Sequence, residues 1–121
     1  MESILILCDK SPFGTNLTAE AIRITSGFLG LGPTIDCNLV FDEDAVYFLS
    51  KAINVEKLKV DTLEEPLELL DLVDATVYVV KKALEERGMS ESDLVDDVAI
   101  ELIDEFQLAE MIAKSPSSFR M

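Results

Sequence analysis

The sequence contains no histidine and only two cysteines, Cys8 and Cys37. Without an imidazole, the chain alone cannot build a Ser-His-Asp or Cys-His nucleophile pair, or a zinc site that uses histidine ligands. Two thiols in 121 residues also exclude a disulfide scaffold. The chemistry that remains open is that of carboxylates, backbone groups and a free thiol.

Positive charge is scarce as well. The sequence has ten Lys and Arg and 24 Asp and Glu, which gives a formal net charge of −14. A surface that binds nucleic acid or anionic lipid must neutralise phosphates with basic side chains. We therefore expect no nucleic-acid partner.

Long apolar runs are missing too. The start of the chain, "MESILILCDKSP", has neither a basic segment nor the length of a signal peptide, and no run approaches the ~20 apolar residues of a membrane span. Together with the few thiols, this predicts a cytoplasmic protein with reduced cysteines and no membrane partner. No repeat or Pro/Gly-rich linker interrupts the sequence, so we expect one domain over residues 1–121.

Short apolar runs alternate with helical patterns along the chain. The first run, "SILILC", is a continuous apolar stretch of strand length, as in a strand covered on both faces. The following segment, "NLTAEAIRITSGFLGLG", places Leu17, Ala21, Ile24, Phe28 and Leu31 on one helical face. Its other face carries Ala19, Ile22 and Leu29, which indicates either contact with a second partner or a well-covered helix.

The remaining pattern continues this alternation. We expect strands at 34–41, 75–80 and 98–102, helices at 45–53, from about 62, at 81–88 and at 104–115, a surface connection at 54–63 and a frayed tail at 116–121. In the last helix, Phe106, Ala109, Met111 and Ile112 are expected to cover one side. Such alternation predicts a small doubly wound α/β domain, with a parallel sheet and helices on both faces.

In such folds, ligands bind beyond the carboxyl ends of the strands, here residues 8–16, 42–44 and 79–82. The loop "SPFGTN" at 11–16 leads into a helix start and could hold an anion on backbone N–H groups. The candidate ligand-binding residues are Asp9, Ser11, Gly14, Thr15, Asn16 and Asp44. The alternative reading is a Gly/Pro turn with a helix cap, because the P-loop and dinucleotide motifs are absent.

Two further features of this edge have two readings each. Asp42, Glu43 and Asp44 could bind a hard cation, but acids in a first helical turn also complement the helix dipole, and we predict no metal and no cofactor. Cys8 could be a reactive thiol if it is exposed and its pKa is lowered by Lys10 or a helix start. Otherwise it is a small buried side chain, as we expect for Cys37 in mid-strand.

The order of these segments resembles that of the DsrE/DsrF family of sulfur-relay proteins. The resemblance covers nearly the whole chain and is carried by "ILILCDKSPFGTNLTAEAIRI", "LVFDEDAVYFL", "VYVVKKALEERGM" and "LVDDVAIELIDEFQLAEMIAKS". It implies a three-layer α/β/α fold and transfer of persulfide sulfur in active members. It also implies assembly as homotrimers, homohexamers or complexes of related subunits, with sulfur-carrier proteins as partners.

The family's reactive cysteine lies at the end of the third strand, where this sequence has Val80, and a further cysteine of some members falls near Ala83. Persulfide chemistry needs a thiolate that holds and releases the outer sulfur, and neither position supplies one. Two hypotheses follow. Either the chain is a non-catalytic or accessory subunit of a sulfur-relay assembly, or it is a sulfur carrier or anion-binding protein that uses Cys8 and the 11–16 loop.

Overall fold

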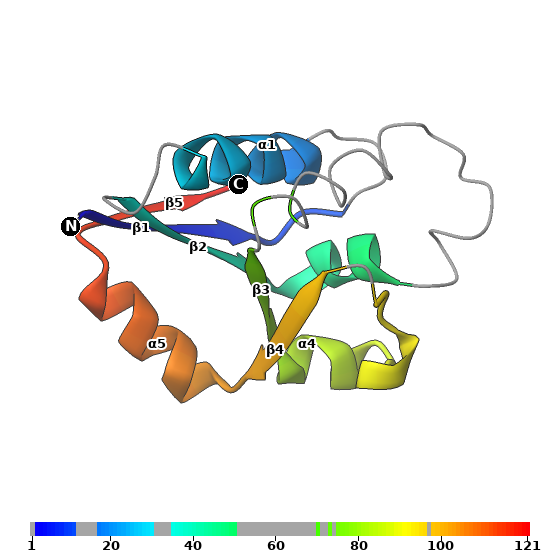
Figure 1. Ribbon diagram of the computed structural model, residues 1–121. Coiled ribbons are helices and arrows are strands. Elements are labelled where there is room, and N and C mark those ends of the chain that lie inside the picture. The colour runs from blue at the N-terminus through cyan, green and yellow to red at the C-terminus, as the bar shows by residue number, and fades with distance from the viewer. Residues whose placement is uncertain are drawn as a thin grey trace.

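Five parallel strands form one sheet in the computed structural model, which describes residues 2–11, 17–30, 35–50, 70, 73, 75–96 and 98–121 (Figure 1). The sheet order is β4-β3-β2-β1-β5. The strands are β1 (Glu2–Cys8), β2 (Ile35–Phe41), β3 (Thr76–Val80), β4 (Ala99–Ile103) and β5 (Ser117–Arg120). The α/β prediction with a parallel sheet is confirmed.

Helices cover both faces of this sheet. Figure 1 shows α1 (Leu17–Leu29) on one side of the strands and α5 (Glu105–Lys114) on the other. The short helix α4 (Lys81–Glu86) follows β3, and the 3-10 helices η1 (Glu43–Leu49) and η2 (Glu91–Asp93) follow β2 and α4. Within the described residues, no helix is both long enough and apolar enough to span a membrane.

The core lies along the central strands. Leu5 and Ile6 are successive residues of β1 that point to opposite faces, and both are almost fully buried, so the strand is covered on both sides. On β2, Phe41 packs edge-to-face on Phe48 of η1, with ring centroids 6.2 Å apart. The continuous apolar run "SILILC" was therefore a reliable strand signal.

Helix α1 is rotated relative to the sequence expectation. Among residues 20–29 of this helix, Ala21, Ile22 and Thr25 are buried, although Ile22 was predicted to lie on the opposite face from Ala21. Ile24, expected to face the sheet, is 41% exposed. The Thr25 hydroxyl donates to the carbonyl of Ala21 at 2.9 Å. Because this bond satisfies the hydroxyl, a polar residue can lie on the buried side of the helix, where the apolar pattern predicts only apolar residues.

The expected frayed tail is wrong: Ser117–Arg120 forms β5 and pairs in parallel with β1. The Met121 N–H donates to the Leu7 carbonyl at 2.8 Å, and the Asp9 N–H donates to the Met121 carbonyl at 3.3 Å. Its partner strand lies at the other end of the sequence, so a local reading of "PSSFRM" could not see this pairing. The pairing also brings the C-terminus beside the end of β1.

The last helix also differs from its prediction. Asp104 caps α5 by accepting from the Gln107 N–H at 2.7 Å, and the Gln107 side chain accepts from the Asp104 N–H in return. Phe106, predicted to cover one side, is 73% exposed, and Ala109 and Ile112 are exposed too. Met111 packs against the core as expected, together with Leu108, which was not on the predicted side. The predicted connection at 54–63 and most of the helix expected after it lie outside the described residues.

Candidate functional site

The carboxyl ends of β2 and β3 and the starts of α4 and α5 enclose a polar hollow of about 90 Å³. This is well below the ~300 Å³ at which small-molecule pockets begin, so the hollow fits a group of a few atoms. It is lined by Asp42, Glu43, Val80, Lys82, Ala83, Glu86 and Glu105. We refer to these seven residues as the polar hollow.

The two positions that the family resemblance assigns to cysteine both lie in the polar hollow. Val80, the last residue of β3, and Ala83, one turn into α4, are each 2% exposed, so they contribute little surface to the hollow. The other lining residues carry four carboxylates and one ammonium group, and Lys82 Nζ lies 3.8 Å from Glu105 Oε1. The hollow is therefore small and lined by charged groups, and at the two positions where the resemblance implies cysteine this chain has aliphatic side chains.

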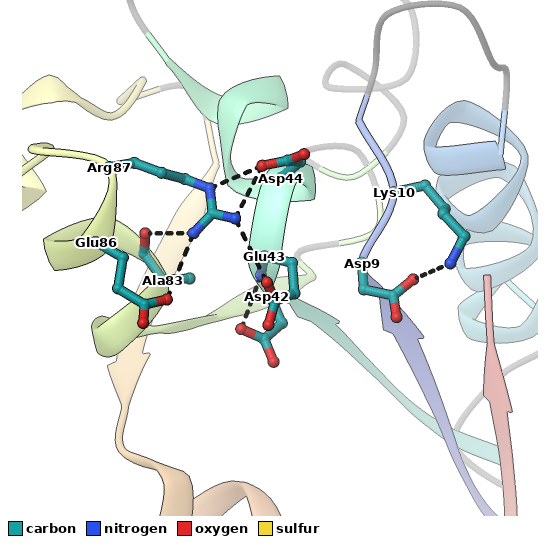
Figure 2. Close-up of polar contacts among 8 residues, drawn as sticks. All are labelled: Asp9, Lys10, Asp42, Glu43, Asp44, Ala83, Glu86 and Arg87. Carbon is teal, nitrogen blue, oxygen red and sulfur yellow. Dashed lines mark hydrogen bonds and ion pairs between the residues drawn. The ribbon is translucent and has the colours of Figure 1, made fainter.

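Arg87 organises the acidic turn beside the hollow. Its Nε and Nη2 lie 2.9 Å and 2.8 Å from Asp44 Oδ1, its Nη2 lies 3.4 Å from Glu43 Oε2, and its Nη1 donates to the Ala83 carbonyl at 3.1 Å (Figure 2). Burial lowers the pKa of Arg87, but the hydrogen bond and charge of Asp44 outweigh it and raise the pKa above its ordinary value. Asp44, a candidate ligand-binding residue, is therefore engaged in tying η1 to α4.

The same turn contains a strained residue. Glu43 has a φ of 48°, in the left-handed region that costs a non-glycine residue ~1–2 kcal/mol. Its N–H donates to Asp42 Oδ1 at 2.8 Å, and its carboxylate reaches Arg87. Burial raises the pKa of Asp42, although the hydrogen bond from Glu43 opposes the shift. Among the described residues, no group of three or more Asp, Glu or Cys side chains is arranged to hold a metal ion.

Asp9 lies at the end of β1 with a carboxylate that is mostly buried. Its oxygens lie 3.0 Å from Lys10 Nζ and 2.7 Å from Arg120 Nε. The structure thus gives this candidate two cationic partners, one local and one from β5. Ser11 is half-buried at the start of the loop. Gly14, Thr15 and Asn16 lie outside the described residues, so anion binding by the 11–16 loop stays a prediction.

Cys8 occupies the predicted edge, but its thiol faces inward. It is fully buried, and burial, followed by the charge of Asp9, raises its pKa to about 12. A pKa raised this far above neutrality disfavours the thiolate, which is the nucleophilic form. Lys10, which the sequence suggested as an activating charge, pairs with Asp9. This environment is the opposite of the one that thiol chemistry at Cys8 requires.

Cys37 is buried as well, although 6% of its surface is exposed whereas none of Cys8 is. It lies opposite Ile4, while Cys8 lies opposite Phe41, so the two thiols are four residues apart along neighbouring strands. At ~3.3 Å per residue this separation excludes a disulfide between them, and both are free. Burial raises the pKa of Cys37, partly offset by a hydrogen bond with Thr25. Both cysteines of the chain are therefore buried thiols.

The sequence analysis missed Arg87, Arg120 and Glu105 as members of this edge. Arg87 ends a helix about forty residues from the acidic turn, and Arg120 belongs to the tail that was expected to fray. One signal was available: after a helix at 104–115, the strand-helix alternation calls for another strand, and "SSFR" is the segment left to form it.

Comparison with known proteins agrees with this architecture. The DsrE/DsrF-like family model matches residues 2–117. The intracellular sulfur oxidation protein DsrF of Allochromatium vinosum is 24% identical over 132 aligned positions, which cover 98% of this chain and 96% of that protein.

Two solved structures share the fold. The YchN protein of E. coli aligns over the full length of both chains with a TM-score of 0.82 at 20% identity. MTH1491 of Methanobacterium thermoautotrophicum, described as a protein of unknown function, has a TM-score of 0.66 at 12% identity over 99% of this chain and 98% of its own. With a family match along almost its whole length, the chain belongs to the DsrE/DsrF-like family.

Proposed function

We propose that this protein acts in sulfur metabolism as a non-catalytic or accessory subunit of a DsrE/DsrF-type assembly. Its family and its similarity to a protein named for intracellular sulfur oxidation support the metabolic role. The side chains at the polar hollow support the accessory role. A subunit that keeps the hollow but lacks its thiol can contribute shape and charge to an assembly without carrying sulfur.

The observation that carries this proposal is Val80 at the end of β3. Sulfur transfer requires a thiolate that attacks a sulfane sulfur and later releases it to a second thiol. Val80 and Ala83 have no sulfur, and the two thiols that exist are buried with raised pKa values. No group within the described residues meets the requirement for an accessible, ionised thiol.

Assembly with other subunits is supported by large apolar side chains on the surface. Ile24 on α1, Phe106 and Ile112 on α5 and Phe119 on β5 are each at least 40% exposed. Each of these side chains would be removed from water if another subunit covered it, which favours association. The partners we propose are further copies of this chain or related DsrE-family subunits, with sulfur-carrier proteins contacting the assembly.

Thiol labelling tests the accessory role. The folded protein is exposed to iodoacetamide at pH 7.5, and separately to a sulfane-sulfur donor followed by mass spectrometry, with a sample in 6 M guanidinium chloride as the reference. We expect no alkylation and no added sulfur until the chain is denatured, when both cysteines react. The variants Cys8→Ala and Cys37→Ala assign any reaction to one thiol.

The competing hypothesis, a sulfur carrier that uses Cys8, makes the opposite prediction. Rapid alkylation of Cys8 in the folded protein, together with a persulfide on the same residue, would refute the accessory role. Loss of that signal in Cys8→Ala but not in Cys37→Ala would place the chemistry at the end of β1.

A further inference from the structure

Strand β5 stands at one edge of the sheet. Among the strands that the structure describes, β1 pairs with its inner side and none pairs with its outer side. All four of its residues are exposed, and the Phe119 side chain is 54% exposed. Unpaired main-chain groups along an edge strand are a template for another strand.

The hydrogen bonds of Met121 identify which groups point outward. Its N–H and its carbonyl both bond to β1, through Leu7 and Asp9. Because main-chain direction alternates along a strand, Phe119 also faces β1, and Ser118 and Arg120 direct their N–H and carbonyl groups to the open edge. The next outward position is Pro116, which has no N–H and ends this row.

We propose that a second copy of this chain pairs with β5 in antiparallel orientation, about a two-fold axis that passes beside Phe119. In this register Ser118 of one copy lies opposite Arg120 of the other, and each such pair exchanges two hydrogen bonds, giving four in all. Phe119 then faces Phe119 of the second copy at a non-hydrogen-bonded position, where opposite side chains are closest. Shifting the axis to Ser118 brings Pro116, which has no N–H, into the ladder and places each Phe119 opposite Ser117 of the other copy, so the contact between the two Phe119 side chains is lost.

Charge favours a second copy at this edge over other surfaces. The chain carries a net charge of −14, so two copies repel wherever carboxylates face each other. The segment "KSPSSFRM" at 114–121 contains no acidic residue, and the charge of Arg120 is balanced by Asp9 at 2.7 Å. In contrast, residues 90–96 expose Glu91, Asp93 and Asp96 and contain no basic residue, and α5 exposes Glu105 and Glu110 against the single Lys114.

The edge is short, so we expect reversible, concentration-dependent pairing. This inference rests on the assembly in the proposed function and assigns one of its contacts. Its test is the mass in solution, which does not depend on thiol chemistry. A persulfide on Cys8 would refute the accessory role but not the contact through β5. A solution mass that substitutions in β5 do not change would refute the contact through β5 but not the accessory role.

The experiment is sedimentation equilibrium of the full chain over micromolar to submillimolar concentrations. Ser118→Pro removes an outward N–H without touching the bonds to β1, and Ser118→Ala is its matched control because it keeps that N–H. Phe119→Lys places two like charges opposite each other across the axis. Circular dichroism verifies that each variant is folded, and Phe119→Lys decides the question if Ser118→Pro is not.

We expect the wild-type protein and Ser118→Ala to reach an even multiple of 13.4 kDa, and Ser118→Pro and Phe119→Lys to halve that mass. Slower hydrogen exchange at the amides of Ser118 and Arg120 with rising concentration would accompany pairing. A wild-type mass of one chain at every concentration overturns the proposal. A larger mass that neither edge variant changes overturns it equally.

Discussion

Arg87 holds the acidic turn against α4, and removing its side chain should cost stability in a defined range. Hydrogen bonds to charged groups contribute ~1.5–3 kcal/mol when buried, whereas exposed ion pairs contribute ~0.2–1 kcal/mol. The Arg87 side chain is only 15% exposed, but the carboxylates of Asp44 and Glu43 are more than half exposed. We therefore expect Arg87→Ala to lower the free energy of unfolding by ~1–2 kcal/mol, including the lost packing of its aliphatic stem.

The assay is urea unfolding at pH 7 and low salt, monitored by circular dichroism, with the free energy extrapolated linearly to water. The control is Arg23→Ala. Arg23 forms an exposed ion pair with Glu20 one turn away on α1, so its removal should change the free energy of unfolding by less than ~0.5 kcal/mol. Arg87→Met keeps much of the stem and separates packing from charge.

A double-mutant cycle with Asp44→Asn isolates the pair itself. If the interaction joins η1 to α4 as the 2.8 Å contact indicates, the cycle should return a coupling of ~1 kcal/mol, decreasing with added salt. The reasoning is refuted if Arg87→Ala destabilises the protein no more than Arg23→Ala does. A coupling near zero would show that Arg87 acts through its stem alone.

Three further outcomes are expected. Because burial raises the pKa of Asp42, the folded state binds its proton more tightly than the unfolded state, so this group's contribution to stability falls as pH rises from its ordinary value through the raised one. Asp42→Asn keeps the oxygen that accepts from Glu43, and urea unfolding should favour the variant more at pH 7 than at pH 4; an unchanged difference contradicts the shift. Val80→Cys, in a background of Cys8→Ala and Cys37→Ala, should be alkylated faster in the folded state than either native thiol, since position 80 borders the polar hollow; equal silence would mean that the hollow admits no reagent. Arg120→Met should cost only ~0.5 kcal/mol in urea unfolding, because Arg120 is 69% exposed and Asp9 keeps Lys10; a loss above ~1.5 kcal/mol would contradict this.

The strands that were read correctly from the sequence are those whose composition decides their environment. "SILILC" is apolar throughout, which predicts a strand buried on both faces. The β-branched residues before Val80 favour a strand over a helix. The sequence predicts helix α1 but not which of its faces is buried. Thr25 is buried because its hydroxyl bonds to the Ala21 carbonyl, and a pattern based on apolar side chains does not include such a hydrogen bond.

The candidate site was predicted as an edge and not as a set of contacts. The rule for the carboxyl ends of parallel strands correctly brought residues 42–44 and 79–82 together. Arg87 and Arg120 were missed because each acts on carboxylates far away in the sequence. The inward orientation of the Cys8 thiol depends on the pleat of β1 and on what covers it, and neither is visible in "CDKSPFGTN".

The place of β1 in the sheet has a consequence for how the chain folds as it is synthesised. β1 is an interior strand, and the strand on its second side, Ser117–Arg120, is synthesised after it, because α1, β2, β3, β4 and α5 lie between the two in the sequence. Until β5 is made, one edge of β1 lacks this partner, and closing it requires a contact between segments far apart in the sequence, which is slow to form. A chain in which β5 has not yet formed, or from which it has been removed, therefore presents an apolar strand with an open edge, and β5 protects that edge against aggregation.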